Sequence, residues 1–427
     1  MTHPDRSVAP AVADICDLRL APSRSLTLPN GVALTIINQG DQPVSRLTLL
    51  WEGGELDFSP RELPAIMMEC LREGAENLSG EQIEDIIDFN GAILSRYPSM
   101  HHTGLTLFCL NHRLPHLLEM LRQIIFHPTF LPDAVNRQIA KTAANVRISL
   151  SKVGFIANHT ASARICGLNH PEALMPSPEQ IEAITPQQVI DTHRRIIGSG
   201  RLCAFLAGQI DSQTEALVID FLSKFPGPAS DSPIHIQKYS AEAPQRIDVP
   251  MPQAVQSAIT MCIPTIDRSH PDYINLRLSV MALGGYFGSR LMQNIREDLG
   301  LTYGISAALH GAPEGAYIRI AAQCDHSYID QVIDQTILEM QKLADQLIDA
   351  DELTRLRRYA WSNLATTADS PFTTADYYIT SRLVATPPTY FADQLAAIRH
   401  LTPATIQSLA RTYFTPSTLQ IATAGPA

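Results

Sequence analysis

The sequence predicts an α+β protein made of two homologous α/β-sandwich domains. Two observations carry this prediction. Strand-like and helical segments are mixed along the chain and joined by hairpins and long antiparallel connections, a pattern that favours α+β layers over a doubly wound parallel sheet. In addition, one helix-and-strand unit occurs twice, near the end of each half of the 427-residue chain. That length is enough for two or three domains.

Strands are expected early in the first half. SLTLPNGVALTII (25–37) and VSRLTLLWEG (44–53) have the composition of strands, and the polar turn NQGDQP joins them. Further on, GAILSRYPSMHHTGLTLFCL (91–110) alternates between apolar and polar residues and is rich in strand formers. These segments supply enough strands for a sheet.

Helices are expected between and after these strands. The stretch 63–92 reads as a helix, a glycine-containing turn and a second helix, which Ser79 opens with Gln82 three residues later in a capping-box pattern. Two more helices are predicted, over HRLPHLLEMLRQII (112–125) and from about 133 to 150. The first half therefore contains both layers of a sandwich.

The strongest organisational signal is an internal repeat. ITPQQVIDTHRRIIGSGRLCAFLAG (184–208) and LTPATIQSLARTYFTPSTLQIATAG (401–425) align without a gap. Each begins with a Thr-Pro helix start and runs through an amphipathic helix into a closing strand. Two such copies, each ending a half of similar length, imply a duplicated domain.

The repeat sets the expected domain boundaries. We expect a first domain over 1–224, a linker over 225–245 and a second domain over 246–427. The linker contains FPGPASDSPIH (225–235), whose proline and serine content is typical of a connecting segment.

Composition excludes several classes of function. The net charge of -11 opposes binding to DNA or RNA, and the chain has no run of lysines and arginines to act against that repulsion. We expect no membrane span, because no apolar run approaches the required length. The seven cysteines are scattered without a C-x-x-C pair, which indicates reduced thiols. With no signal-peptide pattern at the N-terminus, the expected location is the cytoplasm.

Four segments together point to a family. They are LTLPNGVALTI (26–36), WEGGELDFSPRELPA (51–65), EGAENLSGEQIEDIIDFNGA (73–92) and LGGYFGSRLMQNIREDLGLTYGISA (283–307). In these segments the chain resembles the insulinase/pitrilysin-like zinc metallopeptidases, most closely the short two-domain members related to the mitochondrial processing peptidase. The resemblance covers nearly the whole chain. It implies a duplicated metallopeptidase-like fold that forms half of a clamshell.

The chain departs from this family at the zinc site. The resembling enzymes carry an H-x-x-E-H helix, which supplies two zinc ligands and a general base on one helix face. The matching positions here are Ala65, Met68 and Glu69, and the place of the third ligand falls at about Asn145. We therefore expect no zinc in this chain and no peptidase activity from it alone. The helix becomes a packing element, with Glu69 and its neighbours towards a cavity or solvent.

Other residues of the first half do not replace the missing ligands. The segment between His3 and His101 has no histidine. His101 and His102 are adjacent in a predicted strand, where neighbouring side chains point to opposite faces, so they cannot both reach one ion. We expect one of them at the surface and the other half-buried.

The second half retains what the resemblance identifies as a functional pair. Arg296 and Tyr303, in IREDLGLTY, stand where the family carries an arginine and a tyrosine that help to hold substrate and stabilise the oxyanion. Guanidinium and phenol are both suitable donors for a developing negative charge. The alternative is structural, with Arg296 solvated at a helix end and Tyr303 filling the core.

Two functions from different classes follow. In the first, the chain is the zinc-less subunit of a heterodimeric peptidase, and Arg296 and Tyr303 act in trans on an extended peptide bound mainly to a homologous zinc-bearing subunit. Such a peptide would add as a strand to a sheet edge. In the second, the chain is a non-enzymatic peptide-binding or scaffold protein that keeps the clamshell fold. A homodimer with unrelated chemistry is a weaker third option, because the sequence offers no nucleophile and base constellation.

Overall fold

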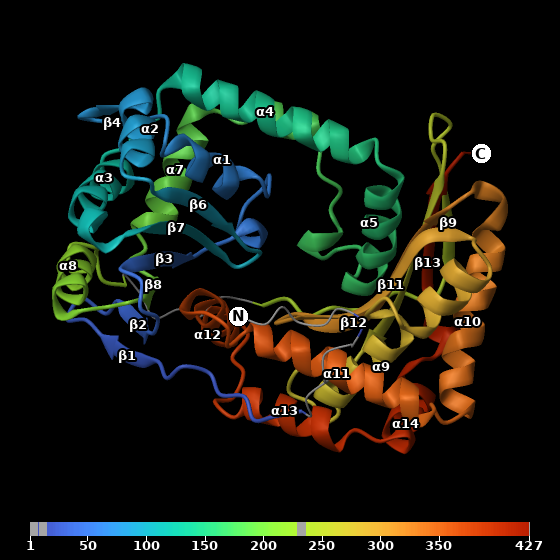
Figure 1. Ribbon diagram of the computed structural model, residues 1–427. Helices are drawn as coiled ribbons and strands as arrows, with labels where there is room; N and C mark the ends of the chain where they lie inside the picture. The colour runs from blue at the N-terminus through green and yellow to red at the C-terminus, as the bar shows by residue number, and fades with distance from the viewer. Residues whose placement is uncertain (1–6, 8–14, 229–235, 427) are drawn as a thin grey trace.

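The computed structural model describes residues 7, 15–228 and 236–426. These residues form two mixed β-sheets, each covered by helices, so the predicted α+β class is confirmed (Figure 1). Residues 229–235 of the predicted linker lie outside the described residues. Residues 239, 240 and 242 are fixed by backbone hydrogen bonds to Glu314, Cys166 and Arg164.

The first sheet has the strand order β1-β2-β8-β3-β7-β6. Its strands are β1 (Arg24–Thr27), β2 (Ala33–Asn38), β3 (Val44–Glu52), β6 (Ile93–Pro98), β7 (His102–Leu110) and β8 (Leu202–Gly208). The pair β2 and β8 is parallel, whereas the other neighbours are antiparallel. The short strands β4 (Gly74–Ala75) and β5 (Leu78–Ser79) form a separate hairpin.

The second sheet repeats this topology in the order β11-β12-β10-β13-β9. Its strands are β9 (Arg246–Pro250), β10 (Ser257–Thr265), β11 (Thr302–Ala312), β12 (Gly315–Cys324) and β13 (Gln420–Gly425). The pair β9 and β13 is parallel, as β2 and β8 are in the first sheet, and the remaining neighbours are antiparallel. Read from the other edge, its five strands match β2-β8-β3-β7-β6 in turn, and β1 of the first sheet has no counterpart. The predicted duplication is therefore present in the fold.

Helices are present in both halves. Those of the first half are α1 (Leu63–Cys70), α2 (Gly80–Phe89), α3 (Leu114–Phe126), α4 (Pro132–Leu150), α5 (Val153–Cys166), α6 (Pro178–Glu182), α7 (Pro186–Ile197) and α8 (Ser212–Leu222). Those of the second half are α9 (Tyr273–Gly284), the π-helix η4 (Met292–Asp298), α10 (Ile329–Asp345), α11 (Ala350–Thr366), α12 (Pro371–Leu383), α13 (Tyr390–His400) and α14 (Pro403–Tyr413). Short 3-10 turns are η1 (Glu55–Asp57), η2 (Asn111–Arg113), η3 (Pro171–Ala173), η5 (His326–Tyr328) and η6 (Pro416–Thr418).

Helix starts follow the capping chemistry read from the sequence. The side chain of Ser79 accepts a hydrogen bond from the backbone of Gln82, which completes the predicted capping box. In the repeated unit, Thr185 and Thr402 cap α7 and α14 in the same way, each followed by a proline at the first helical position.

Each sheet is covered on one face by a helix from the other half. Helix α5, although it belongs to the first half in sequence, packs on β10 and β13, where Ala157 meets Ala258 and Ala424. Reciprocally, α12 from the second half packs on β2 and β8 of the first sheet. Figure 1 shows both crossings, with α4 leading from the side of the first sheet to α5 beside the second.

Small and branched apolar side chains allow α5 and α12 to pack closely on the sheets of the other half. Ala161 and Ile165 of α5 contact Cys262 and Ala422. On the other side, Ile379 of α12 is 1% exposed and packs between Leu50 and Phe205 of the first sheet. The opposite faces of both sheets pack on their own helices and form the two main cores.

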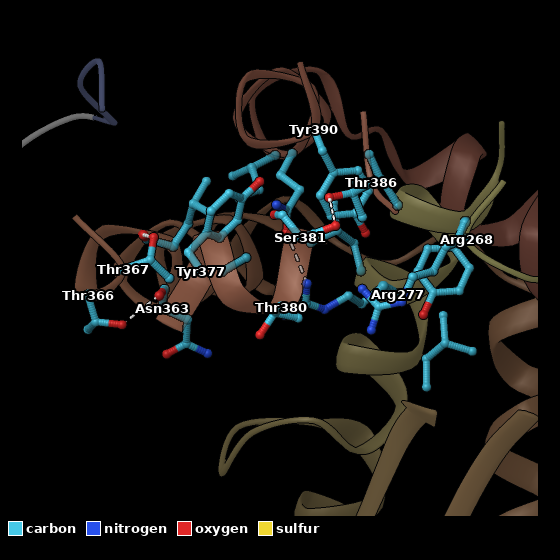
Figure 2. A pocket seen from close by; sticks show the side chains of 18 of the residues that line it. Arg268, Arg277, Asn363, Thr366, Thr367, Tyr377, Thr380, Ser381, Thr386 and Tyr390 are labelled. Atoms are coloured by element: carbon cyan, nitrogen blue, oxygen red, sulfur yellow. Dashed lines mark hydrogen bonds between the residues drawn. The ribbon is translucent and has the colours of Figure 1, made fainter. Parts of the chain in front are cut away.

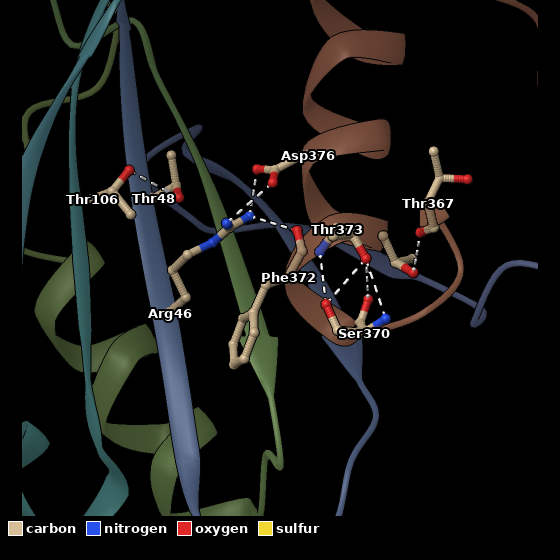
Figure 3. A network of polar contacts seen from close by, with 9 residues as sticks. Arg46, Thr48, Thr106, Thr367, Ser370, Phe372, Thr373 and Asp376 are labelled. Atoms are coloured by element: carbon tan, nitrogen blue, oxygen red, sulfur yellow. Dashed lines mark hydrogen bonds and ion pairs between the residues drawn. The ribbon is translucent and has the colours of Figure 1, made fainter. Parts of the chain in front are cut away.

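Polar contacts fix the position of α12. The guanidinium of Arg46 in β3 donates to Asp376 at 2.6 Å and to the backbone carbonyl of Phe372 at 2.8 Å. Its plane also lies 5.8 Å from the Phe372 ring centroid. Figure 3 shows these contacts together with the cap formed by Ser370 and Thr373 at the start of the helix. The arginine is largely buried, with 15% of its side chain exposed, so the pair is a structural bridge between the halves.

Substituting Ile379 by alanine tests whether α12 holds the first sheet. We expect the free energy of unfolding to fall by about 2–5 kcal/mol, because the change leaves a cavity between two buried apolar residues. Urea denaturation followed by circular dichroism measures this change. The matched control is Ile148→Ala, at a side chain that is 54% exposed on α4, where a change within about 0.5 kcal/mol is expected. Equal losses for the two variants would contradict the role given to α12.

Candidate functional site

Helix α1 places the positions of the zinc motif on two different faces. Ile66, Met67 and Leu71 are at most 1% exposed, as expected for a helix that serves as a packing element. Met68 is also buried, at 1%, and packs in the core of the first half. Only Ala65 and Glu69, one turn apart, remain on the partly exposed face. The side chain at position 68 is therefore buried in the core, and the side chain at position 65 is only a methyl group.

Glu69 forms an ion pair with Arg96. The arginine stands on β6, the edge strand of the first sheet, and 37% of its side chain is exposed. A guanidinium in contact with the carboxylate occupies the space in which a cation would have to approach it. No pattern in the sequence singled out Arg96, because an arginine in an alternating edge strand is an ordinary outward-facing residue.

The cavity beside α1 has a volume of about 370 Å³. Its charged lining comprises four glutamates and two arginines: Glu69, Glu73, Glu81, Glu84, Arg72 and Arg137. The arginines bind carboxylates across it, with 2.6 Å between Arg72 and Glu84 and 2.8 Å between Arg137 and Glu73. Ion pairs between lining residues thus neutralise much of the charge in this cavity.

Helix α4 faces this cavity through Arg137 and Gln138. The amide of Gln138 donates to Glu73 at 2.6 Å. Asn145, expected near the third ligand position, is exposed and does not line the cavity. It lies seven residues beyond Gln138, about 10 Å further along the helix axis. The structure therefore does not bring Asn145 together with Glu69.

These residues do not fit a zinc ion. Zinc in proteins is held by imidazole, thiolate and carboxylate ligands, three or four to a site. Alanine and methionine stand at two of the motif positions, and the one carboxylate is bound to Arg96. Within residues 15–228 and 236–426, no group of three or more histidine, cysteine or acidic side chains is arranged to hold a metal.

Arg296 lies on the π-helix η4 at the surface of the second half. Its guanidinium lies over the ring of Phe287, 4.9 Å from the centroid, and donates to Glu297 at 2.9 Å. Phe287 is itself 65% exposed. An arginine stacked on an exposed aromatic ring offers a planar donor edge outward.

Tyr303 does not fill the core, because 89% of it is exposed. It stands in β11, the edge strand of the second sheet, where the pairing with β12 shifts register between Thr302 and Ile305. The Thr302 hydroxyl accepts from the backbone of Gly304 at 3.1 Å and donates to the carbonyl of Gln323 at 2.5 Å. Such a bulge re-aims a side chain out of the strand.

A cavity of about 570 Å³ lies beside Tyr303. Helix α5 contributes Gly154 and Asn158 to its wall, and β12 contributes Arg319, which donates to Asn158 at 3.1 Å. Arg296 does not line this cavity. The structure thus brings Tyr303 together with residues that the sequence did not single out, and Arg296 stands apart on the preceding helix.

The two halves meet at an ion pair between His101 and Glu314. The imidazole Nε2 lies 2.5 Å from a carboxylate oxygen of Glu314, and the side chains are 14% and 2% exposed. The expectation of a surface histidine is therefore wrong for His101, and His102 is half-buried as well. Close by, the Tyr239 hydroxyl donates to Glu172 at 2.9 Å.

The pKa values of His101 and His102 are shifted in opposite directions. The hydrogen bond to Glu314 raises the pKa of His101 against the opposing effect of burial. Burial pushes the pKa of Glu314 upward, but the hydrogen bond with His101 leaves it below its usual value. Burial instead lowers the pKa of His102 to about 4. Neighbours in sequence thus have pKa values that are shifted in opposite directions.

Comparisons with known proteins agree with the fold. Residues 69–166 match the model of the insulinase (peptidase family M16) family, and residues 183–359 match that of the peptidase M16 inactive domain. No curated protein matches the chain in sequence. Within residues 15–228 and 236–426, no helix has both the length and the apolar character needed to cross a membrane.

Three solved structures illustrate the similarity. A peptidase M16 inactive domain from Pseudomonas fluorescens has 20% identity and a TM-score of 0.85 over 95% of this chain and 98% of that one. A protease from Helicobacter pylori has 15% identity and a TM-score of 0.84 over 96% and 100%. A chain of complex III2 from Candida albicans has 10% identity and a TM-score of 0.75 over 94% and 95%. At these identities the likeness shows the fold alone.

The stability of His101→Gln and His102→Gln should change with pH in opposite ways. His101 has a raised pKa, so its contribution is present below about pH 6.5 and is lost as the pH rises through the raised value. We expect His101→Gln to lower the free energy of unfolding by about 1.5–3 kcal/mol at pH 6 and by less at pH 9. Urea denaturation at each pH measures these changes.

His102 provides the matched control. It is neutral in the fold but protonated in the unfolded chain between about pH 6.5 and about 4, so it destabilises the fold as the pH falls through this range. The variant His102→Gln should therefore gain stability relative to the unsubstituted protein at pH 5 compared with pH 8. The same pH trend in both variants would contradict the assignment.

Proposed function

The chain belongs to the insulinase, or peptidase M16, family, and from this premise we propose that it is a zinc-less, non-catalytic subunit of a heterodimeric metallopeptidase. A homologous subunit with an intact H-x-x-E-H helix would supply the zinc and the general base. This chain would supply Arg296 and Tyr303 from its second half. The two chains would close over the peptide as the halves of a clamshell.

One contrast carries this proposal. In the first half, Met68 is buried and Glu69 is bound to Arg96, so these two positions of helix α1 have no free side chain that could activate a water molecule. In the second half, Tyr303 is an 89% exposed aromatic side chain that stabilises no core of its own. Large exposed aromatic residues are enriched where a protein contacts a ligand or a partner.

The chemistry of the two side chains suits a role in trans. The phenol of Tyr303 is exposed, and the guanidinium of Arg296, which is paired with its surface neighbour Glu297, is partly exposed. Each could stabilise the oxyanion of a peptide bound to a partner. Strand β11 is a sheet edge with free backbone groups next to the bulge at Thr302. An extended peptide could pair with such an edge, which gives affinity through backbone contacts.

Domain boundaries and location are part of the proposal. We retain 1–224 and 246–427 as the two homologous domains, with 225–245 between them.

The cytoplasm remains the proposed location. It is supported by seven free cysteines, five of which are buried as small apolar side chains.

A non-enzymatic scaffold or peptide-binding role is the second candidate. The observation that favours it is the likeness, over almost the whole chain, to a subunit of complex III2 from Candida albicans. Under this alternative Phe287, Arg296 and Tyr303 would form an assembly surface. A homodimer would be one form of such an assembly.

Reconstitution with a zinc-bearing homologue tests the proposal. The full-length chain is purified from its native host, and the proteins that co-purify with it are identified together with their zinc content. Peptidase activity of the reconstituted pair is then measured with the variants Arg296→Ala and Tyr303→Phe. We expect kcat to fall by about 10²-fold or more for each variant, as for removal of one oxyanion donor.

Matched controls distinguish catalysis from assembly. Arg358→Ala on α11 and Tyr328→Phe on η5 change exposed residues of the same types away from the proposed site, and they should leave kcat within about twofold. If the pair assembles and its activity is unaffected by Arg296→Ala and Tyr303→Phe, the role in trans is wrong. A stable assembly with no zinc-bearing member would favour the scaffold.

A further inference from the structure

The second half contains a cavity that the proposed function does not use. Its volume is about 520 Å³, within the range of pockets that hold small organic ligands. Helices α9, α11, α12 and α13 enclose it, together with the loop that leads from β10 into α9. Figure 2 shows Arg268 and Arg277 at one end of the view and Asn363, Thr366 and Thr367 at the other.

Two arginines give the cavity an unbalanced positive charge. Arg268 comes from the loop before α9, and Arg277 comes from α9 itself. Within the described ranges, neither guanidinium lies within 4.0 Å of a carboxylate oxygen; Arg277 donates instead to the amide oxygen of Gln394 at 3.0 Å. The one acidic residue of the lining, Asp376, is already bound to Arg46. Two positive charges therefore face the cavity without counter-charges.

Buried polar groups at the cavity are also left without partners. The Nε of Arg268 and the hydroxyl of Tyr390 are shielded from solvent and find no hydrogen-bond partner among the described residues. Tyr390 is only 6% exposed. Leaving a buried donor unpaired costs about 1–3 kcal/mol, so such groups mark places where a missing acceptor would be stabilising.

Aliphatic side chains form one part of the remaining wall, and hydroxyl and amide side chains form another. Leu278 and Met281 of α9, Leu309 of β11 and Leu364 of α11 line the cavity. Leu278 is buried, and Leu364 is 8% exposed. This distribution, with cationic donors at one end and aliphatic side chains beside them, is typical of a site for a molecule with an anionic head and an apolar body.

We propose that this cavity binds a small amphipathic anion, whose carboxylate or phosphate head contacts Arg268 and Arg277 and whose apolar body packs on Leu278, Met281 and Leu364. The guanidinium fork matches either head group in geometry. Neither Arg296 nor Tyr303 lines this cavity.

Isothermal titration of the full-length protein with matched eight-carbon probes tests this inference. Octanoate, octyl phosphate and octanol share the apolar body and differ in the head group. We expect at least one anion to bind ten-fold or more tighter than octanol, and the better of the two identifies the preferred head. If all three bind equally, or none binds, the inference is overturned.

Variants show whether the titrated site is this cavity. Arg268→Met and Arg277→Met keep an aliphatic stem but remove the charge, and each should weaken binding of the preferred anion about ten-fold with little effect on octanol. Two variants are used because one of them alone could perturb folding. Arg358→Met, on the exposed face of α11, is the control and should bind as the unsubstituted protein does. Anion affinity unchanged in both cavity variants would place the binding elsewhere and overturn the inference.

The substitution Tyr390→Phe separates binding from stability. Because it removes a buried hydroxyl that has no partner, it should leave the melting temperature of the ligand-free protein unchanged or higher. If the hydroxyl contacts the ligand head, affinity for the preferred anion should fall while stability does not. A fall in melting temperature would contradict the reading of this hydroxyl as unpaired.

Discussion

The burial of both sheets depends on two helices exchanged between the halves. Each sheet packs one face on its own helices and would expose the other if the halves were separate. Helix α5 closes the second sheet through alanines at 157 and 161, and α12 closes the first through Ile379. Small side chains let α5 approach the strands closely, and Arg46 with Asp376 fixes the position of α12. The cavities beside Tyr303 and above α9 exist because these helices lie where they do.

Ion pairs hold the region around α1 together. Ala65 and Met68 turn the helix into a packing element, and Glu69 is bound to Arg96 across to the edge strand. Around them, Arg72 and Arg137 neutralise other glutamates. Opening this network of ion pairs would leave carboxylates without their partners, at a modest cost for each partly exposed pair.

Much of the fold could be predicted from the sequence, because local sequence patterns determine most of its helices and strands. Alternation, helical periodicity, the cap at Ser79 and the Thr-Pro repeat all act over a few residues, and the buried residues of α1 follow from its period. The exchange of α5 and α12 could not be predicted. The alanines along one face of α5 indicate close packing, but they do not indicate which of the two sheets the helix packs on. The pairing of Glu69 with Arg96, the bulge that exposes Tyr303 and the lone arginines at 268 and 277 also depend on contacts between distant segments. The resemblance identified the positions of Arg296 and Tyr303, but whether they act remains a prediction.

The exchange of helices also sets an order for synthesis on the ribosome. The last strand of the first sheet, β8, ends at Gly208, whereas the helix that covers this sheet ends only at Leu383. At about 5–20 residues per second, the first sheet must wait on the order of ten seconds or more before α12 emerges. During that interval Ile37, Leu50 and Phe205 have no native cover. Completion of the first half is therefore a late event of translation.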